Sequence, residues 1–377
     1  MKKKKICLIV GISPFFLGGV SLYQKHLLDY IESKKLEMDI SVLYSGNEKK
    51  VFYKKGVKYV QLKNTFPYPF NQIIDNIKFK SFIQKNDFDI INSHAVWGHW
   101  MNSYKRRRNQ RILHTYHGIT FNFFRNHLRR FNLFKKILCI PLLIFSYYIE
   151  KPPLKHADKI VCVSDKVKKQ IETLYGKRKN LVVIRTGVDL KKFKVRNKLT
   201  LRKKFGLKKD KLYGLYIGGG GYWTKGLDRT IKISEEIYKL NKNYRLIIIG
   251  ADKKKVNHLI DKKFVIFLNR VPREDISQYH SLADFFFCLS RYEGGAPTMV
   301  VSESMASGSL LICSQSAQQE IIKDGENGLI IKNYNKHEAK RILKNRHNKK
   351  IISNSKKTIQ ELSLNNWGKS YLSELLE

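Results

Sequence analysis

Short apolar runs alternate with segments of helical period over almost the whole chain, which predicts strands and helices in turn. In the first half, the predicted strands are residues 6–10, 40–43, 59–62, 90–92, 112–115, 160–163 and 182–184, with predicted helices such as 22–34 and 165–174 between them. After a break, further strands are predicted at residues 213–217, 245–249, 265–267, 285–289, 310–314 and 329–331. This alternation is typical of parallel sheets covered by helices on both faces.

The break between the two series of strands divides the chain into two domains. Residues 193–211 are highly charged and have a weak apolar period, which predicts a linker with one short helix. A chain of 377 residues with 42% hydrophobic residues is long enough and apolar enough for two cores. We predict α/β domains over 1–190 and 212–360, a hinge over 191–211, and a C-terminal helix over 361–377 that crosses back to the first domain.

The charge of the chain restricts its partners. Lys and Arg number 73 against 31 Asp and Glu, a formal net charge of +42. Such a field attracts nucleic acid, anionic phospholipid headgroups or phosphorylated substrates. Compositional bias toward Lys is the alternative explanation, but the low number of acids argues against it. No helix-turn-helix, RRM, KH or zinc signature is present, so a nucleic-acid-binding protein is a minor rival hypothesis and we expect no nucleic-acid partner.

Cysteine usage and hydropathy indicate the compartment. Five single cysteines without CxxC spacing suggest neither disulfides nor zinc, and a reducing cytoplasm fits them best. The longest apolar stretch, 137–149, is too short to span a bilayer and contains Pro141. The N-terminus superficially resembles a signal peptide, but its β-forming run before a glycine loop favours a first strand.

Glycines follow two of the predicted strands, where open α/β sheets bind ligands. Gly18 and Gly19 precede the first helix, and Gly218–Gly221 precede Lys225 at the next helix of the second half. A residue without Cβ lets an anion approach backbone amides at the positive end of a helix. Ordinary tight turns are the alternative, and GxxxxGK[ST] is absent, so this is not a Walker loop.

The most informative stretch of the sequence is 285–308. A buried strand ends near Ser290, a Gly-Gly-Ala-Pro loop follows, and helical period begins near Thr298 with Pro297 at the first helical position. Amides of that first turn would point at an anion. Glu303 lies further along the helix among apolar neighbours, and we expect its carboxylate to accept hydrogen bonds from sugar hydroxyls. A solvated helix residue is the alternative.

Taken together, these segments resemble the retaining glycosyltransferases of family 4 (glycosyl transferases group 1). The matching segments, in the family's order, are GISPFFLGGVSLYQKHLLDYI, DFDIINSHAVWG, RILHTYHG, ADKIVCVSDKVKKQI, VVIRTGVDLKKF, TKGLDRTI, VPREDISQYHSLADFFFCLSRYEGG, SESMASG and SAQQEIIKDGENGLII. The resemblance implies the GT-B fold, two Rossmann-like α/β domains whose parallel sheets face each other across an interdomain cleft. It further implies transfer of a sugar from a nucleotide-diphospho-sugar, with the donor on the C-terminal domain and the acceptor on the N-terminal one.

The resemblance also implies roles for individual residues. Lys225 would pair with the diphosphate, Glu303 would hold the ribose hydroxyls, and His117 would lie beside the transferred sugar. The other residues implied in donor binding are Gly18, Gly19, Gly219, Gly220, Glu293, Gly295, Ala296, Pro297, Thr298, Met299 and Val300. Developing phosphate charge would be stabilised by Lys225 and backbone amides, so neither a metal nor another cofactor is expected.

The sequence departs from the family pattern in two places. Glu293 stands earlier than the family's spacing to Glu303 would place the first glutamate, so either Glu293 still reaches the sugar or backbone alone makes that contact. Glycines 219 and 220 occupy the places where the family usually has an arginine, and Arg270 or Arg291 is a possible substitute. These departures keep open a GT-B binding or regulatory protein with a degraded donor site.

Other histidines and acids have competing interpretations. His94, at a strand end, is a weaker site candidate than His117, and His114 is expected inside its strand. Asp87 and Asp89 imitate a metal-binding DxD, but they precede a strand where the family has a structural acid, so no metal site is predicted.

The prediction of the acceptor class depends on the segment between His117 and Lys155. Its cations alternate with Phe, Leu and Ile at helical spacing, which is typical of an amphipathic helix on an anionic membrane; a buried helix is the alternative, and the part from Leu138 onward is expected in the core. We therefore predict a lipid-linked or cell-surface glycan acceptor and a cytoplasmic protein peripheral to the inner face of the cytoplasmic membrane. The expected donor is a UDP-, GDP- or ADP-linked sugar.

Overall fold

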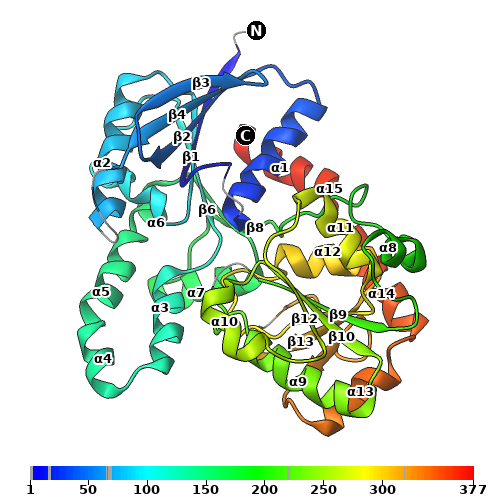
Figure 1. The fold of residues 1–377 in the computed structure, drawn as a ribbon. Helices are drawn as coiled ribbons and strands as arrows, with labels where there is room; N and C mark the ends of the chain where they lie inside the picture. The colour runs from blue at the N-terminus through cyan, green and yellow to red at the C-terminus, as the bar shows by residue number, and fades with distance from the viewer. Residues whose placement is uncertain (1–2, 16–17, 65, 67–69, 219–220, 318) are drawn as a thin grey trace. The chain divides into compact units, whose positions relative to one another are not determined.

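The computed structural model describes residues 3–15, 18–64, 66, 70–218, 221–317 and 319–377. The chain forms two compact units: residues 1–185 with 367–377, and residues 186–366. The predicted boundary at 190 thus lies a few residues beyond the observed division. Each unit contains one sheet with helices (Figure 1).

Unit 1 is built on an eight-stranded sheet in the order β3-β4-β2-β1-β5-β6-β7-β8. Its strands are β1 (Lys4–Gly11), β2 (Met38–Gly46), β3 (Lys50–Lys54), β4 (Val57–Lys63), β5 (Ile90–His94), β6 (Arg111–Tyr116), β7 (Lys159–Cys162) and β8 (Leu181–Val183). All neighbours pair in parallel except β3 with β4. The sequence did not predict β3, because this edge strand is almost wholly exposed and has no buried apolar run.

The helices of unit 1 include one from the far end of the chain. They are α1 (Gly19–Ser33), α2 (Phe70–Lys85), η1 (Ala95–Met101), α3 (Thr120–His127), η2 (Leu128–Arg130), α4 (Leu133–Leu138), α5 (Ile140–Ile149), α6 (Pro152–His156), α7 (Asp165–Tyr175) and most of α15 (Leu364–Leu376). Figure 1 shows α15, in red, beside α1, in blue. Trp367 packs edge-on against Tyr23 of α1, and the hydroxyl of Tyr371 lies 2.6 Å from Asn92 Nδ2 and from Thr115 Oγ1. The terminal helix therefore belongs to the core of unit 1.

Unit 2 is built on a six-stranded parallel sheet in the order β11-β10-β9-β12-β13-β14. Its strands are β9 (Leu212–Ile217), β10 (Tyr244–Ile249), β11 (Val265–Leu268), β12 (Phe285–Cys288), β13 (Leu310–Ser314) and β14 (Leu329–Ile331). Its helices are α8 (Lys198–Lys204), α9 (Leu227–Leu240), α10 (Lys253–Ile260), α11 (Arg273–Leu282), α12 (Met299–Ser307), η3 (Gln315–Ala317), α13 (Lys336–Lys344) and α14 (Lys349–Gln360).

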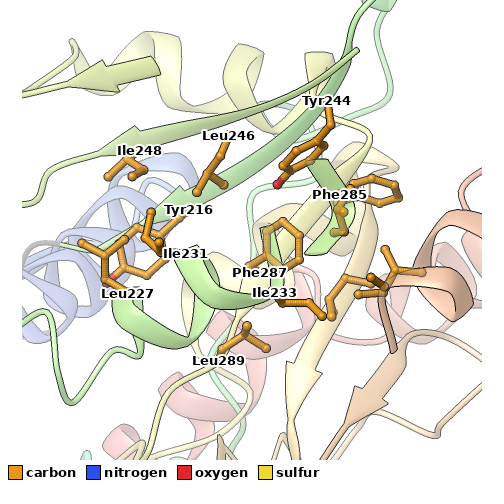
Figure 2. Packing of buried hydrophobic residues seen from close by; sticks show 14 of the residues in the cluster. Tyr216, Leu227, Ile231, Ile233, Tyr244, Leu246, Ile248, Phe285, Phe287 and Leu289 are labelled. Carbon is orange, nitrogen blue, oxygen red and sulfur yellow. The ribbon is translucent and has the colours of Figure 1, made fainter. Parts of the chain in front are cut away.

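Both faces of this sheet are buried, as the continuous apolar runs predict. On β10, Leu246 and Ile248 join one core cluster while Ile247 and Ile249 join the other. Figure 2 shows the first cluster, in which Tyr216, Phe285 and Phe287 pack with Leu227 and other side chains. The two-residue period of a strand divides its side chains between the two faces.

The segment that the sequence predicted as a linker packs into unit 2. Arg202 on α8 is buried, and its guanidinium lies 2.7 Å from Asp284 Oδ2. The same carboxylate oxygen accepts a hydrogen bond from the amide of Tyr213 at the start of β9. The predicted short helix is therefore fixed to the sheet of unit 2.

Candidate functional site

The strand order of each sheet shows where ligands would bind. In unit 2, β9 lies between β10 and β12, and in unit 1, β1 lies between β2 and β5, so the chain winds outward in both directions from these strands. Open α/β sheets bind ligands beyond the carboxyl ends of the strands at such switch points. In unit 2 the switch point places Lys225, which follows β9, near Glu293, which follows β12.

Glycines fix the position of Lys225. Gly226 is the N-cap of α9 with φ of +71°, and a Cβ there would lie 2.0 Å from the carbonyl oxygen of Leu289. Gly221 also has a positive φ, and its carbonyl accepts from the amide of Lys225. Gly219 and Gly220, predicted to bind the donor, lie outside the described residues. The turn after β9 thus brings the start of α9 against the end of β12.

Lys225 forms an ion pair with Glu293. Its Nζ lies 2.7 Å from Glu293 Oε2, and the Lys225 side chain is 36% exposed while that of Glu293 is 7% exposed. Burial acts to lower the pKa of Lys225, but the charge of Glu293 and the hydrogen bond outweigh it, so the pKa lies above its usual value. Ser290 Oγ donates to the other carboxylate oxygen. Glu293 therefore shares one site with Lys225, although it stands earlier than the family spacing.

Helix α12 begins one residue later than the sequence predicts. Thr298 is its N-cap, so Pro297 lies outside the helix and not at its first position. Gly295 is half-buried, and Ala296 and Pro297 are buried. The amide of Thr298 donates to Gln319 Oε1 at 2.9 Å, so this predicted phosphate contact is occupied. The amides of Met299 and Val300, in the first turn, have no acceptor within the helix.

Glu303 points to a neighbour that the sequence did not single out. Its side chain is 10% exposed, and Oε2 lies 3.6 Å from Nε2 of His280, which is fully buried on α11. That separation is too long for a hydrogen bond. His280 lies in the segment VPREDISQYHSLAD, whose helical period is the one sequence feature that could have placed this histidine on a buried face.

The two candidate substitutes for the missing arginine differ. Arg291 donates to Asp228 through both terminal nitrogens, at 2.7 and 2.6 Å, and lies over the Trp223 ring. Its guanidinium is therefore committed to holding the turn before α9. Arg270 is exposed and follows β11 at the same edge of the sheet, which leaves it as the better candidate.

In unit 1, the carboxyl ends of β5 and β6 hold a histidine pair. His94 Nδ1 lies 3.0 Å from His117 Nε2, and the rings stack at 5.2 Å. Tyr23 of α1 meets the His117 ring edge-on at 4.8 Å. Burial lowers the pKa of His117 to about 4 and that of His94 well below its usual value. Both imidazoles are therefore neutral at pH 7, and one ring nitrogen of the pair donates to the other.

The remaining unit 1 candidates fall into two groups. Gly18 is the N-cap of α1, and a Cβ at Gly19 would meet no described atom within 4 Å, so packing of the described residues does not require glycine at 19. His114 is fully buried within β6, and its Nδ1 lies 2.8 Å from Ser93 Oγ, as expected for a residue inside the strand. The close approach predicted at Gly19 remains sterically open.

The acidic pair before β5 has structural contacts. Asp87 pairs with Arg107, and Asp89 Oδ2 accepts from the amide of Lys5 at 2.7 Å. Both acids precede β5 and so lie at the amino end of that strand, opposite His94. Within the part of the chain that the structure describes, no group of three or more His, Cys, Asp or Glu side chains could hold a metal ion.

Comparison with known families and structures agrees with this arrangement. The family model "Glycosyltransferase Family 4" matches residues 17–192, and "Glycosyl transferases group 1" matches residues 197–358. An uncharacterized glycosyltransferase of Methanocaldococcus jannaschii, MJ1069, is 25% identical over 98% of this chain and 97% of its own length.

Solved structures share the fold. Sucrose-phosphate synthase from Thermosynechococcus elongatus has a TM-score of 0.80 at 18% identity and covers 99% of this chain and 98% of its own. WaaG, a glycosyltransferase involved in lipopolysaccharide biosynthesis, has a TM-score of 0.77 at 14% identity, with 99% of both chains covered. Anabaena HepE in complex with UDP and glucose has a TM-score of 0.72 at 15% identity, with 99% of both chains covered. The two α/β units are those of the GT-B fold, and the chain belongs to the group 1 glycosyltransferases.

Proposed function

We propose that this glycosyltransferase moves a sugar from a nucleotide-diphospho-sugar to a lipid-linked or cell-surface glycan acceptor. In this proposal the anomeric configuration is retained and no metal ion is needed. The donor would be a UDP-, GDP- or ADP-sugar; HepE, which shares the fold, is described with UDP and glucose. The observation that carries the proposal is the half-exposed Lys225 beside Glu293 at the switch point of unit 2.

The chemistry that these groups support is stabilisation of a diphosphate leaving group. Negative charge grows on the diphosphate as the glycosidic bond breaks, and a fixed ammonium and helix amides lower the energy of that state. Lys225 supplies the ammonium, the amides of Met299 and Val300 supply the donors, and Arg270 supplies a second cation. We assign the nucleotide ribose to Glu303 and the transferred sugar to Glu293.

His117 would lie beside the transferred sugar. Its neutral imidazole can donate or accept one hydrogen bond, since burial holds its pKa at about 4. It is therefore suited to a polar contact with a sugar hydroxyl and unsuited to acting as a cation at neutral pH. Gly19, at the start of α1, would let the same ligand approach the backbone, since no described atom lies within 4 Å of a Cβ built there, and Gly18 is the N-cap of that helix.

The acceptor class rests on charge. The net charge of +42 attracts anionic surfaces, and a fold neighbour, WaaG, is described as acting in lipopolysaccharide biosynthesis. Within the described residues, no helix is both long and apolar enough to cross a bilayer. We therefore propose peripheral association with the anionic inner face of the cytoplasmic membrane.

Thermal unfolding with UDP, GDP, ADP and their sugars tests the donor assignment. A nucleotide that binds the native state raises the melting temperature by mass action. Lys225→Ala should abolish the shift and reduce donor turnover by orders of magnitude, whereas Lys232→Ala, an exposed lysine on α9, should change neither. An unchanged shift and unchanged turnover in Lys225→Ala would refute the assignment.

Two observations favour a second candidate function. Gln319 occupies the amide of Thr298, and glycines stand where the family usually has a loop arginine, which is what a regulatory nucleotide-binding site with a degraded donor site would show. A nucleotide-induced rise in melting temperature without hydrolysis or transfer for any donor in the panel would support this alternative.

A further inference from the structure

Residues 120–149 form a helical projection from unit 1, which we call the arm. It consists of α3, η2, α4 and α5. Figure 1 shows α3 and α5 side by side, with α4 at the end of the arm farthest from the sheet of unit 1. The sequence predicted the part from Leu138 onward as core, and the structure contradicts this prediction: Leu138 is 63% exposed.

Six of the arm's exposed apolar residues lie on α4 and α5 around its far end, and we call them the apolar edge: Leu133, Phe134, Ile137, Leu138, Ile140 and Ile144. On α4 these residues recur at helical spacing, and on α5 Ile140 and Ile144 lie on the same face one turn apart. Leu133 is 73% exposed and Phe134 is 68% exposed. Large apolar side chains that are exposed together on neighbouring helices are typical of an interaction surface.

The arm also carries several exposed cations. Arg125, Arg129, Arg130, Lys135 and Lys136 are exposed, and the arm contains neither Asp nor Glu. Lys135 and Lys136 lie between the apolar residues of α4 itself. A surface with both features is complementary to an anionic headgroup layer above a hydrocarbon region.

A buried carboxylate fixes the root of the arm. Glu150, directly after α5, accepts from the amide of Thr120 at 2.9 Å with both oxygens and from Thr120 Oγ1 at 2.7 Å. Its backbone carbonyl accepts from the hydroxyl of Tyr116. A carboxylate at the first amide of α3 also favours that helix end. The two ends of the arm are thus tied to each other and to the sheet, which holds the apolar edge in a defined direction.

We propose that the arm is a membrane-insertion element whose apolar edge enters an anionic bilayer while its cations contact the headgroups. This inference deepens the proposed association with an anionic surface and rests on it. A second copy of the chain is disfavoured as the occupant, because it would bring equal uncompensated positive charges together. Insertion differs from electrostatic adsorption in one measurable respect: apolar burial persists when salt screens the charges.

Flotation with phosphatidylglycerol–phosphatidylcholine vesicles at low salt and at high salt tests insertion. We expect wild-type binding to weaken but persist at high salt. Phe134→Ser and Leu138→Ser should each weaken partitioning about tenfold, since each removes a largely exposed side chain that insertion would bury. Phe70→Ser is the matched control, because Phe70 is 62% exposed on α2, outside the arm.

A fluorophore on Cys139 gives a second readout. Cys139 lies between α4 and α5 and is half-buried, whereas the other four cysteines are buried. Its emission should shift to the blue on vesicle addition and be quenched by brominated lipid. The nucleotide-induced thermal shift, measured in the same variants, reports folding of the donor site independently of lipid.

The outcomes separate insertion from the broader proposal. Equal high-salt binding by Phe134→Ser and Phe70→Ser would overturn insertion, as would binding that high salt abolishes while low-salt binding persists. Lipid-free dimerisation that Phe134→Ser abolishes would identify a second copy as the occupant and also overturn it. Absence of any vesicle binding at low salt would remove the membrane association itself, while the donor assignment would still stand on its thermal shifts.

Discussion

The clearest test of the electrostatics in unit 1 is Glu150→Gln. Burial raises the pKa of Glu150 to about 7 from an ordinary value of 4.5, although hydrogen bonds from Thr120 act in the opposite direction. Glutamine has nearly the same shape, keeps one acceptor oxygen for Thr120 and carries no charge at any pH. The substitution therefore removes the titration and preserves most of the packing at the root of the arm.

The sign and size of the effect follow from linkage. Between pH 4.5 and pH 7 the folded protein binds more protons at Glu150 than the unfolded chain does, so this group's contribution to stability is lost as pH rises through 7. A shift of about 2.5 pKa units corresponds to about 3 kcal/mol. The stability of Glu150→Gln relative to wild type should therefore improve by about 3 kcal/mol between pH 4.5 and pH 8.

Urea denaturation of both proteins at several pH values measures this difference. Other titrating groups are common to both chains and largely cancel when the two curves are subtracted. Glu37→Gln, the same substitution at an exposed glutamate, is the control for the change of side chain. If the stability of the wild type relative to Glu150→Gln instead increases as pH rises, the hydrogen bonds from Thr120 outweigh burial and the reasoning is refuted.

Three further predictions concern the histidine pair, a glycine and the terminal helix. Because burial lowers the pKa of His117 to about 4, the free energy of unfolding of the wild type should fall by about 2 kcal/mol at this site between pH 7 and pH 4.5. His117→Asn removes this titration, so its melting temperature should fall less over the same range. An equal fall in both proteins would contradict the assignment. Gly226→Ala should lower the free energy of unfolding, measured by urea denaturation, by at least about 2 kcal/mol more than Gly56→Ala does. Both glycines have a positive φ, but only at Gly226 would the new Cβ overlap a backbone carbonyl oxygen. Tyr371→Phe should destabilise the protein by about 1–3 kcal/mol, since two buried polar groups lose their partner, while Tyr53→Phe, 70% exposed, should stay near wild type; equal effects would argue against docking of the terminal helix.

Most of the secondary structure was predictable because strands buried on both faces require continuous apolar runs. Every predicted strand overlaps an observed one, since apolar runs such as 245–249 are stable only when buried. The edge strand β3 was not predicted, because a strand that is exposed on both faces does not require apolar side chains. Exposure at an edge is a consequence of strand order, which hydropathy does not encode.

The candidate site was only partly predictable for the same reason. The glycines, strand ends and family resemblance singled out Lys225, Glu293 and His117 as candidates from the sequence. The contact of Lys225 with Glu293 depends on β9 and β12 being neighbours, and this pairing joins segments far apart in the chain. Gln319 at the amide of Thr298 is likewise a contact that only the folded chain creates.

The sequence by itself determined two α/β units, their strands and the residue types at the strand ends, because local periodicity and backbone chemistry are properties of short segments. Tertiary structure alone decided which of those residues meet and which apolar residues remain uncovered. The arm shows the distinction: 138–149 has the composition of a core helix, yet its outer face is exposed because no described element packs over it. Burial depends on neighbours supplied by the rest of the fold, and hydrophobicity expresses only the tendency to seek them.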